Sequence, residues 1–239
     1  MNYNWNWAVL LESPYLGWLA GGAVLTVQIA LSAWCIAFGL GLLLGVCRTL
    51  PLRAARLAAA AYVEVFRNIP LLVQMFFWYF VLPEILPRAA GDWIKRDMPD
   101  PEFATAVLAL GLYTASRVAE QVRSGIQAIR PGLPQAAYAS GMRTAQVYRH
   151  VLLPIALRTV IPPVTSEFLT IFKNSSLALT IGVLELTAQS QQITEYTFQG
   201  FEAFTAATVL YVAIALVVTV AMHQVERRLR IPGVSGTGG

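Results

Sequence analysis

The side chains of this sequence that could do chemistry are cations placed inside long apolar stretches. Arg67, Arg117 and Lys173 each lie roughly 15 to 21 Å from the start of the helix expected to carry them, at about 1.5 Å per residue. An ionised group at the middle of a lipid bilayer costs about 3 kcal/mol or more unless it faces protein or water. We therefore expect these side chains to contact a substrate or to hold a helical bundle together.

Lys173 is the strongest ligand candidate, because no acidic residue lies three or four positions from it. Asn174 and Ser175 follow it and add hydrogen-bonding groups. A cationic pocket of this kind favours a substrate with an excess carboxylate, such as glutamate or aspartate. The same lysine could instead pair with Glu167, and the sequence leaves that alternative open.

A second group of polar residues repeats at spacings of three and four along residues 103–126. Tyr113, Arg117, Glu120 and Ser124 would form one polar stripe on an otherwise apolar helix. Such a stripe lines a pathway or binds another helix. The alternative is that Arg117 with Glu120, and Glu64 with Arg67, are neighbouring ion pairs that only stabilise the bundle.

Catalysis and metal binding are poorly supported by the sequence. It has no GxxxxGK[ST] phosphate loop, no HExxH and no GxSxG motif, and its only histidines are His150 and His223. Cys35 and Cys47 lie in one apolar stretch without metal-ligand spacing. We expect no catalytic residue, no metal site and no cofactor bound by this chain.

The composition indicates the kind of element that positions these residues. Of 239 residues, 56% are hydrophobic and only 13% are charged, and the mean hydropathy is +0.58. A soluble protein has about a quarter of its residues charged, so the chain is predicted to be an all-α membrane protein in contact with the lipid bilayer. Lysine occurs only at Lys95 and Lys173, which argues against a nucleic-acid partner.

Five spans are expected, because a membrane helix needs about 20 apolar residues. The first and last have no charged residue between Glu12 and Arg48 or between Glu202 and Glu226, whereas the three between them contain charges. The expected spans are residues 18–46, 58–82, 103–126, 159–184 and 204–225. Gly17 with Gly21, and Gly41 with Gly45, would let the first span approach another helix closely, within the chain or in a partner.

Arginines in the expected loops set the orientation by the positive-inside rule. They cluster after the first span, in the loop after the third span and after the fifth span, so these regions should face the cytosol and the N-terminus should lie outside. The chain then divides into an outer N-terminal segment (1–17), a transmembrane domain (18–227) and a flexible cytosolic tail (228–239).

The long third loop, about residues 130–154, contains a short helical pattern. Pro134 can open a helix, Ala136 and Ala137 continue it, and Gly141 ends it. The run Gln135-Ala136-Ala137, with Gly141 four residues later and Leu153-Pro154 beyond, resembles the cytosolic coupling loop of permease subunits in bacterial ABC importers.

The resemblance covers roughly residues 20–225. It includes Glu64-Val-Phe-Arg67-Asn-Ile-Pro70, Glu120-x-x-Arg123-x-Gly125 and Phe172-Lys173-Asn174-Ser175-Ser176, which are similar to the polar amino acid branch and most similar to glutamate/aspartate permeases. The family usually has an acidic residue where this chain has Gln135. Gln135 can donate and accept hydrogen bonds but cannot form a salt bridge to the ATPase.

The resemblance implies the type I ABC importer permease fold in a bacterial inner membrane. It implies that Gln135, Ala136, Ala137, Gly141, Leu153 and Pro154 dock on an ATP-binding subunit dimer, which uses the ATP. It also implies a second permease chain, related or identical, and a periplasmic or extracellular binding protein. Arg67, Arg117, Glu120, Lys173, Asn174 and Ser175 are the candidate substrate-pathway residues.

Two alternatives stay open from the sequence. The substrate could be another polar amino acid, such as glutamine or a basic amino acid. An ion-coupled carrier would instead use Glu64, Glu120 and Glu167 as proton or cation sites and would need no ATPase.

Overall fold

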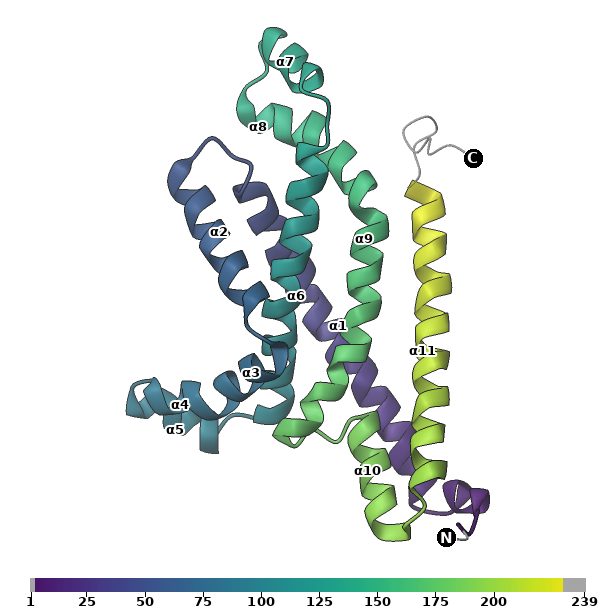
Figure 1. Cartoon of the computed structure of the whole chain (residues 1–239). Helices are drawn as coiled ribbons and strands as arrows, with labels where there is room; N and C mark the ends of the chain where they lie inside the picture. Colours follow the sequence, from purple (N-terminus) through teal and green to yellow (C-terminus); the bar gives the residue numbers. More distant parts are fainter. Residues whose placement is uncertain (1–2, 230–239) are drawn as a thin grey trace.

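The computed structural model describes residues 3–229, and every regular element in that part of the chain is helical (Figure 1). The predicted tail at 228–239 therefore lies almost wholly outside the described residues. The elements are the 3-10 helix η1 (Trp7–Leu11), α1 (Tyr15–Cys47), α2 (Arg53–Asn68), α3 (Leu71–Phe76), the π-helical turn η2 (Phe77–Val81), α4 (Leu82–Ile85), α5 (Arg88–Arg96), α6 (Pro101–Gln127), α7 (Gly132–Ala139), α8 (Thr144–Val147), the π-helical turn η3 (Tyr148–Leu152), α9 (Leu153–Asn174), the 3-10 helix η4 (Ser175–Ile181), α10 (Leu186–Thr197) and α11 (Gly200–Leu229).

Length and composition identify three membrane-spanning candidates among the described residues: Tyr15–Cys47, Thr144–Ile181 and Gly200–Arg228. A fourth arises if the bent pair Arg53–Asn68 and Leu71–Ile85 is one span. Helix α6 is long enough to cross, at roughly 40 Å, but it carries Arg117, Glu120 and Arg123. The count of five spans therefore stays a prediction.

The second expected span, 58–82, is not one continuous helix. Its two halves meet at 105°, because Ile69 precedes Pro70 and takes an extended conformation (φ −95°, ψ 128°). The break frees backbone carbonyls inside an apolar region, where each needs a partner. The side chain of Gln74 is the partner of two of them, because its Nε2 donates to the carbonyls of Phe66 at 2.8 Å and Ile69 at 2.9 Å.

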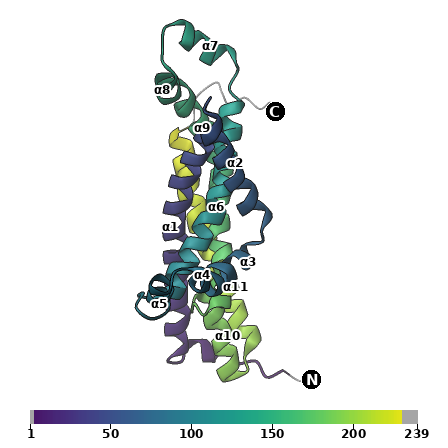
Figure 2. The ribbon, with the colours of Figure 1, turned by 90° about the vertical axis from the view of Figure 1, so that its left-hand side faces the viewer.

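The elements outside the long helices gather at the two ends of the bundle. Helices α7 and α8 lie at one end, and α10 lies at the other, near the N-terminal end of α1 (Figures 1 and 2). The short helices α4 and α5 project sideways from α3 (Figure 1). The two termini of the described chain lie at opposite ends of the bundle.

Helices α1 and α6 form the central contact of the bundle, and glycines make it possible. A Cβ at Gly41 would lie 2.7 Å from the Cβ of Val118, and one at Gly45 would lie 2.6 Å from that of Val122. Gly17 and Gly21 have nothing within 4 Å of such an atom. The Gly41/Gly45 pair therefore serves an approach within the chain, and the Gly17/Gly21 pair makes no such approach here.

Replacing Gly41 by leucine should destabilise the bundle, because the added side chain would overlap α6. Overpacking of this kind costs about 1–3 kcal/mol. Gly39 is the matched control, since it lies two residues away on the same helix with nothing within 4 Å of a Cβ. We expect Gly41→Leu to lower the unfolding temperature in detergent and Gly39→Leu to leave it near the wild-type value. Equal losses in the two variants would contradict the packing described here.

Candidate functional site

The first polar contact inside the bundle joins α6 to α9. The Nε of Arg117 donates to the Oε2 of Glu167 at 2.6 Å, and the same guanidinium lies 6.0 Å from the centre of the Tyr113 ring. Glu167 is buried, whereas 41% of the Arg117 side chain is exposed. The alternative in which Arg117 pairs with Glu120 is therefore not the one in the structure. Glu167, the alternative partner for Lys173, bonds to Arg117 instead.

A second polar contact gathers α1, α2 and α6 around the carboxylate of Glu120. Arg48, at the end of α1, donates to Glu120, and Arg123 donates through Nε at 3.2 Å. The Nη1 of Arg67, in the last turn of α2, lies 3.6 Å from the same carboxylate. The alternative pairing of Arg67 with Glu64 is also not the one in the structure, because the Arg67 side chain extends to the Glu120 carboxylate, which is 21% exposed, rather than to the exposed Glu64.

Lys173, Asn174 and Ser175 stand apart from both contacts. Lys173 is exposed and makes no ion pair with any described residue. Asn174 is half-buried, and Ser175 is fully buried with its hydroxyl donating to the carbonyl of Phe172 at 2.8 Å. In this conformation Ser175 therefore stabilises the turn from α9 to η4.

The depth expected for Lys173 changes with the start of its helix. Helix α9 begins at Leu153, before the expected start at 159, because Pro154 fits the first turn of a helix. Lys173 is then about 20 residues, or about 30 Å, from that start. It lies near the far end of α9 rather than at its middle.

The coupling-loop helix forms much as the sequence indicates. Helix α7 begins at Gly132, so Pro134 lies in its first turn rather than at its start. Gly141 ends it with φ +82°, and the N–H of Met142 donates to the carbonyl of Ala137 at 3.2 Å. This closure is a typical helix C-terminal motif that needs a left-handed residue, so the prediction that Gly141 ends the helix is confirmed.

One face of this loop packs on the bundle and the other is free. Ala137 is buried against α6 and α9, together with Val147 and Leu152, while Gln135 and Ala136 are exposed. Leu153 and Pro154, at the start of α9, are half-buried. The exposed residues can meet another protein while the buried ones hold the loop on the membrane helices.

The hydroxyl of Tyr148 ties the loop to Thr49, just after the end of α1. Tyr148 is buried, and its hydroxyl donates to the carbonyl of Thr49 at 2.7 Å. Thr49 is the neighbour of Arg48, which bonds to Glu120. Sequence analysis missed the roles of Tyr148, Arg48 and Gln74, because their partners lie far along the chain or on a break that no periodicity shows.

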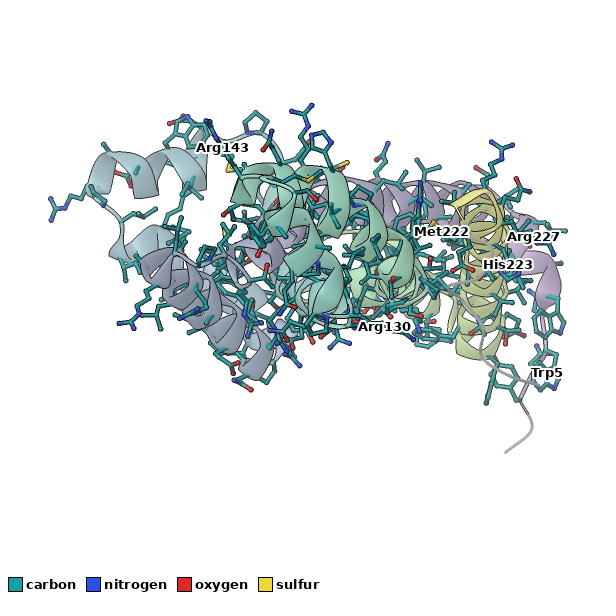
Figure 3. All side chains as sticks on the ribbon, turned by 90° about the horizontal axis from the view of Figure 1, so that it is seen from above. Trp5, Arg130, Arg143, Met222, His223 and Arg227 are labelled. Carbon is teal, nitrogen blue, oxygen red and sulfur yellow. The ribbon has the colours of Figure 1, made fainter. Side chains whose placement is uncertain are left out.

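Cations cluster at this end of the bundle. Figure 3 looks onto it and shows Arg130 and Arg143 at α7 and α8, with His223 and Arg227 on the last turns of α11. The Nδ1 of His223 lies 3.6 Å from the carboxylate of Glu226, one helix turn away on α11. Among the described residues no cluster of three histidine, cysteine, aspartate or glutamate side chains could hold a metal ion.

Known proteins share both the sequence and the fold. Residues 37–231 match the family model of the binding-protein-dependent transport system inner membrane component. The glutamate/aspartate import permease protein GltJ of Escherichia coli is 43% identical, and the match covers 99% of each chain. The glutamine transport system permease protein GlnP of Escherichia coli is 32% identical over 91% of this chain and 95% of its own.

Solved structures confirm the expected type I importer fold. The crystal structure of an amino acid ABC transporter with histidines superposes with a TM-score of 0.78 at 28% identity, over 95% of this chain and 100% of that one. An inward-facing MetNI methionine ABC transporter has a TM-score of 0.75 at 22% identity. The chain therefore belongs to the binding-protein-dependent transport system inner membrane components, the non-catalytic permease subunits of ABC importers, in which a separate subunit hydrolyses ATP.

Proposed function

We propose that this permease moves acidic amino acids, glutamate and aspartate, across a bacterial inner membrane into the cytosol. The observation that carries the proposal is the 43% identity to a glutamate/aspartate import permease over 99% of both chains. Membership in the family implies an ATP-binding subunit and a substrate-binding protein as partners. A second permease chain, related or identical, completes the proposed assembly.

The electrostatics of the bundle support an anionic substrate. Around the two ion-pair groups, four guanidinium groups face two carboxylates, which leaves an excess of positive charge. The side chains of Arg67 and Arg117 remain 43% and 41% exposed despite their partners. Cations with accessible surface in an apolar bundle attract a substrate that carries an extra carboxylate. On this basis we assign Arg67, Arg117 and Lys173 to the substrate pathway. Glu120, as the partner of Arg67, and Asn174 and Ser175, as the chain neighbours of Lys173, complete the proposed pathway set.

The orientation of the bundle in the membrane follows from the arginines that lie at one of its ends. The end of α1 at Arg48, the loop helices α7 and α8, and the last turns of α11 lie together at one end of the bundle (Figure 1). By the positive-inside rule this end faces the cytosol, and the N-terminus lies outside. The exposed residues Gln135 and Ala136 then face the ATP-binding subunit dimer, with Ala137, Gly141, Leu153 and Pro154 supporting that surface.

Glutamine is the second candidate substrate, since GlnP is 32% identical. A glutamine side chain is neutral and gains less from the cations of the bundle. The ion-coupled carrier is set aside, because the family match describes a binding-protein-dependent system and both Glu120 and Glu167 accept bonds from arginines.

Uptake measurements test the substrate and the role of Lys173 together. Initial rates for labelled glutamate, aspartate, glutamine and arginine should fall only for the two acidic amino acids when this chain is deleted. Lys173→Met should lower glutamate uptake by about 10- to 100-fold at low concentration, because a hydrogen bond to a charged group is worth about 1.5–3 kcal/mol. Lys95→Met is the control, since Lys95 pairs with Glu84 outside the bundle core.

Unchanged glutamate uptake by Lys173→Met, at normal membrane levels, would remove Lys173 from the substrate pathway. Loss confined to glutamine or arginine on deletion of the chain would keep the permease assignment and reject the acidic substrate.

A double-mutant cycle separates a structural role of Arg117 from contact with substrate. Glu167→Leu leaves a half-buried guanidinium without its partner and should lower the free energy of unfolding by about 1–3 kcal/mol. Adding Arg117→Met should restore stability, because the pair is then replaced by apolar groups. We expect uptake to stay low in the double variant, measured beside thermal unfolding in detergent. Recovery of both stability and uptake would show that the pair only holds α6 on α9.

The coupling role of α7 depends on the left-handed residue that ends it. Gly141→Ala forces a side chain into φ +82°, at a cost of about 1–2 kcal/mol, and should reduce ATP-driven uptake several-fold at an unchanged protein level. Gly132→Ala is the matched control, because Gly132 begins the same helix, has no positive φ and has nothing within 4 Å of a Cβ. Wild-type uptake by Gly141→Ala would refute the requirement for this loop shape.

A further inference from the structure

The segment at residues 3–11 lies against the start of α11 and covers an acidic side chain there. Glu202, in the first turn of α11, is fully buried. Its Oε1 accepts the backbone N–H of Asn6 at 2.8 Å, and its Oε2 accepts the hydroxyl of Tyr3. Two hydrogen bonds thus fasten the segment to the beginning of a membrane-spanning helix, about 200 residues along the chain.

The fastened segment presents aromatic rings that have no cover. Trp5 and Trp7 stack in parallel with centroids 6.1 Å apart, and Tyr3 meets the edge of Phe201 at 4.8 Å. Yet Trp5 is 59% exposed, Trp7 is 50% exposed and Phe201 is 60% exposed. Figure 3 places Trp5 at the rim of the molecule, on the side of α11. The rings are held in position by one another and by Glu202, and their outer faces are free.

Tyr3, Trp5, Trp7 and Phe201 together form an aromatic patch, and its depth along α11 indicates what covers it. The stretch of α11 without Asp, Glu, Lys or Arg runs from Glu202 to Glu226, about 23 residues or roughly 34 Å. That length matches the hydrocarbon core of a bilayer, about 30 Å. Glu202 therefore stands where the hydrocarbon ends, and the rings packed around it lie at the depth of the lipid headgroups.

The patch also continues into a surface that faces lipid. Only 11% of the most apolar 18-residue stretch of α11 is buried in this chain. Large aliphatic side chains are exposed along that helix. These are Val209, Val212, Leu216, Val217 and Val220. On the segment itself, Asn4 and Asn6 alternate with Trp5 and Trp7 and are exposed. Amides beside indole rings suit the headgroup layer, where one side of the chain is wet and the other apolar.

We propose that Tyr3, Trp5, Trp7 and Phe201 form an aromatic anchor in the lipid headgroup layer, fastened to α11 by Glu202. The anchor fixes the depth of α11 in the membrane at its N-terminal end. Its occupant is the interfacial layer of the bilayer, and not a second copy of this chain or a soluble partner.

A nitroxide label beside the rings tests the proposal in the assembled transporter. Asn4→Cys is labelled in a background with Cys35→Ala and Cys47→Ala, and the complex is reconstituted in phosphatidylethanolamine and phosphatidylglycerol vesicles. Collision rates with oxygen, which partitions into lipid, and with a water-soluble nickel chelate are compared. Val217→Cys, at a side chain that is 70% exposed along α11, gives the hydrocarbon reference. Asp97→Cys, at an exposed residue just after α5 and away from the proposed ATPase-docking loop, gives the water reference.

We expect the oxygen-to-nickel ratio at Asn4 to lie between the two references. A ratio equal to that at Asp97 would place the segment in water, and low collision rates with both reagents would place it under another protein. Either result would overturn the proposal.

Substitutions then identify the groups that hold the anchor. Trp5→Ser with Trp7→Ser should shift the Asn4 ratio to the water value, because the rings no longer partition into the interface. Trp93→Ser is the matched control, since Trp93 is 51% exposed on α5 and belongs to a different element. Glu202→Ala should increase the mobility of the Asn4 label while the label at Val217 keeps its ratio, which also shows that α11 is still inserted. An unchanged label in both the tryptophan and the glutamate variants would contradict the anchor.

Discussion

Charge neutralisation inside an apolar bundle is the constraint on which the rest of this structure depends. Glu120 and Glu167 sit among membrane helices, where an unpaired ion is expensive. Each carboxylate is paired with an arginine from another element: Glu120 with Arg48 and Arg67, besides Arg123 in its own helix, and Glu167 with Arg117. These contacts join α1, α2, α6 and α9, so the same polar groups that suit an anionic substrate also determine which helices are neighbours.

The central position of α6 follows from this arrangement and from close packing. Its arginines and glutamate reach outward to three other helices, while Val118 and Val122 fill the space that Gly41 and Gly45 leave on α1. A helix with a polar stripe cannot face lipid. It is placed instead where Arg117, Glu120 and Arg123 have partners and where Val118 and Val122 are buried.

The loop that we propose to meet the ATP-binding subunit is attached to the same framework. Ala137 packs against the ends of α6 and α9, and Tyr148 bonds to Thr49 at the end of α1. Because Arg48 is the next residue and bonds to Glu120, the loop and the polar interior share one helix end. A displacement of α7 or η3 therefore cannot leave the end of α1 unaffected without breaking that hydrogen bond.

Features that depend on the length of apolar runs or on the conformation of single residues can be predicted from the sequence alone. Charge-free runs before Arg48 and after Glu202 predicted α1 and α11. The Gln135-Ala136-Ala137 run with Gly141 predicted a helix that ends at a glycine. That run, together with the motifs around Arg67, Glu120 and Lys173, resembles the importer family that the family match shows. Apolar length and backbone conformation are read within a few residues, so they need no knowledge of the fold.

Only the tertiary structure decided which charges meet. Arg117 pairs with Glu167, which is 50 residues away, and not with Glu120 in its own helix. Arg67 pairs with Glu120 and not with Glu64. The break before Pro70 is local, but its repair by Gln74 and the position of Lys173 near the end of α9 depend on how the helices are arranged. Helix packing sets which carboxylate on another helix a long side chain can reach, whereas the pair of Glu120 and Arg123 follows from their spacing of three within α6.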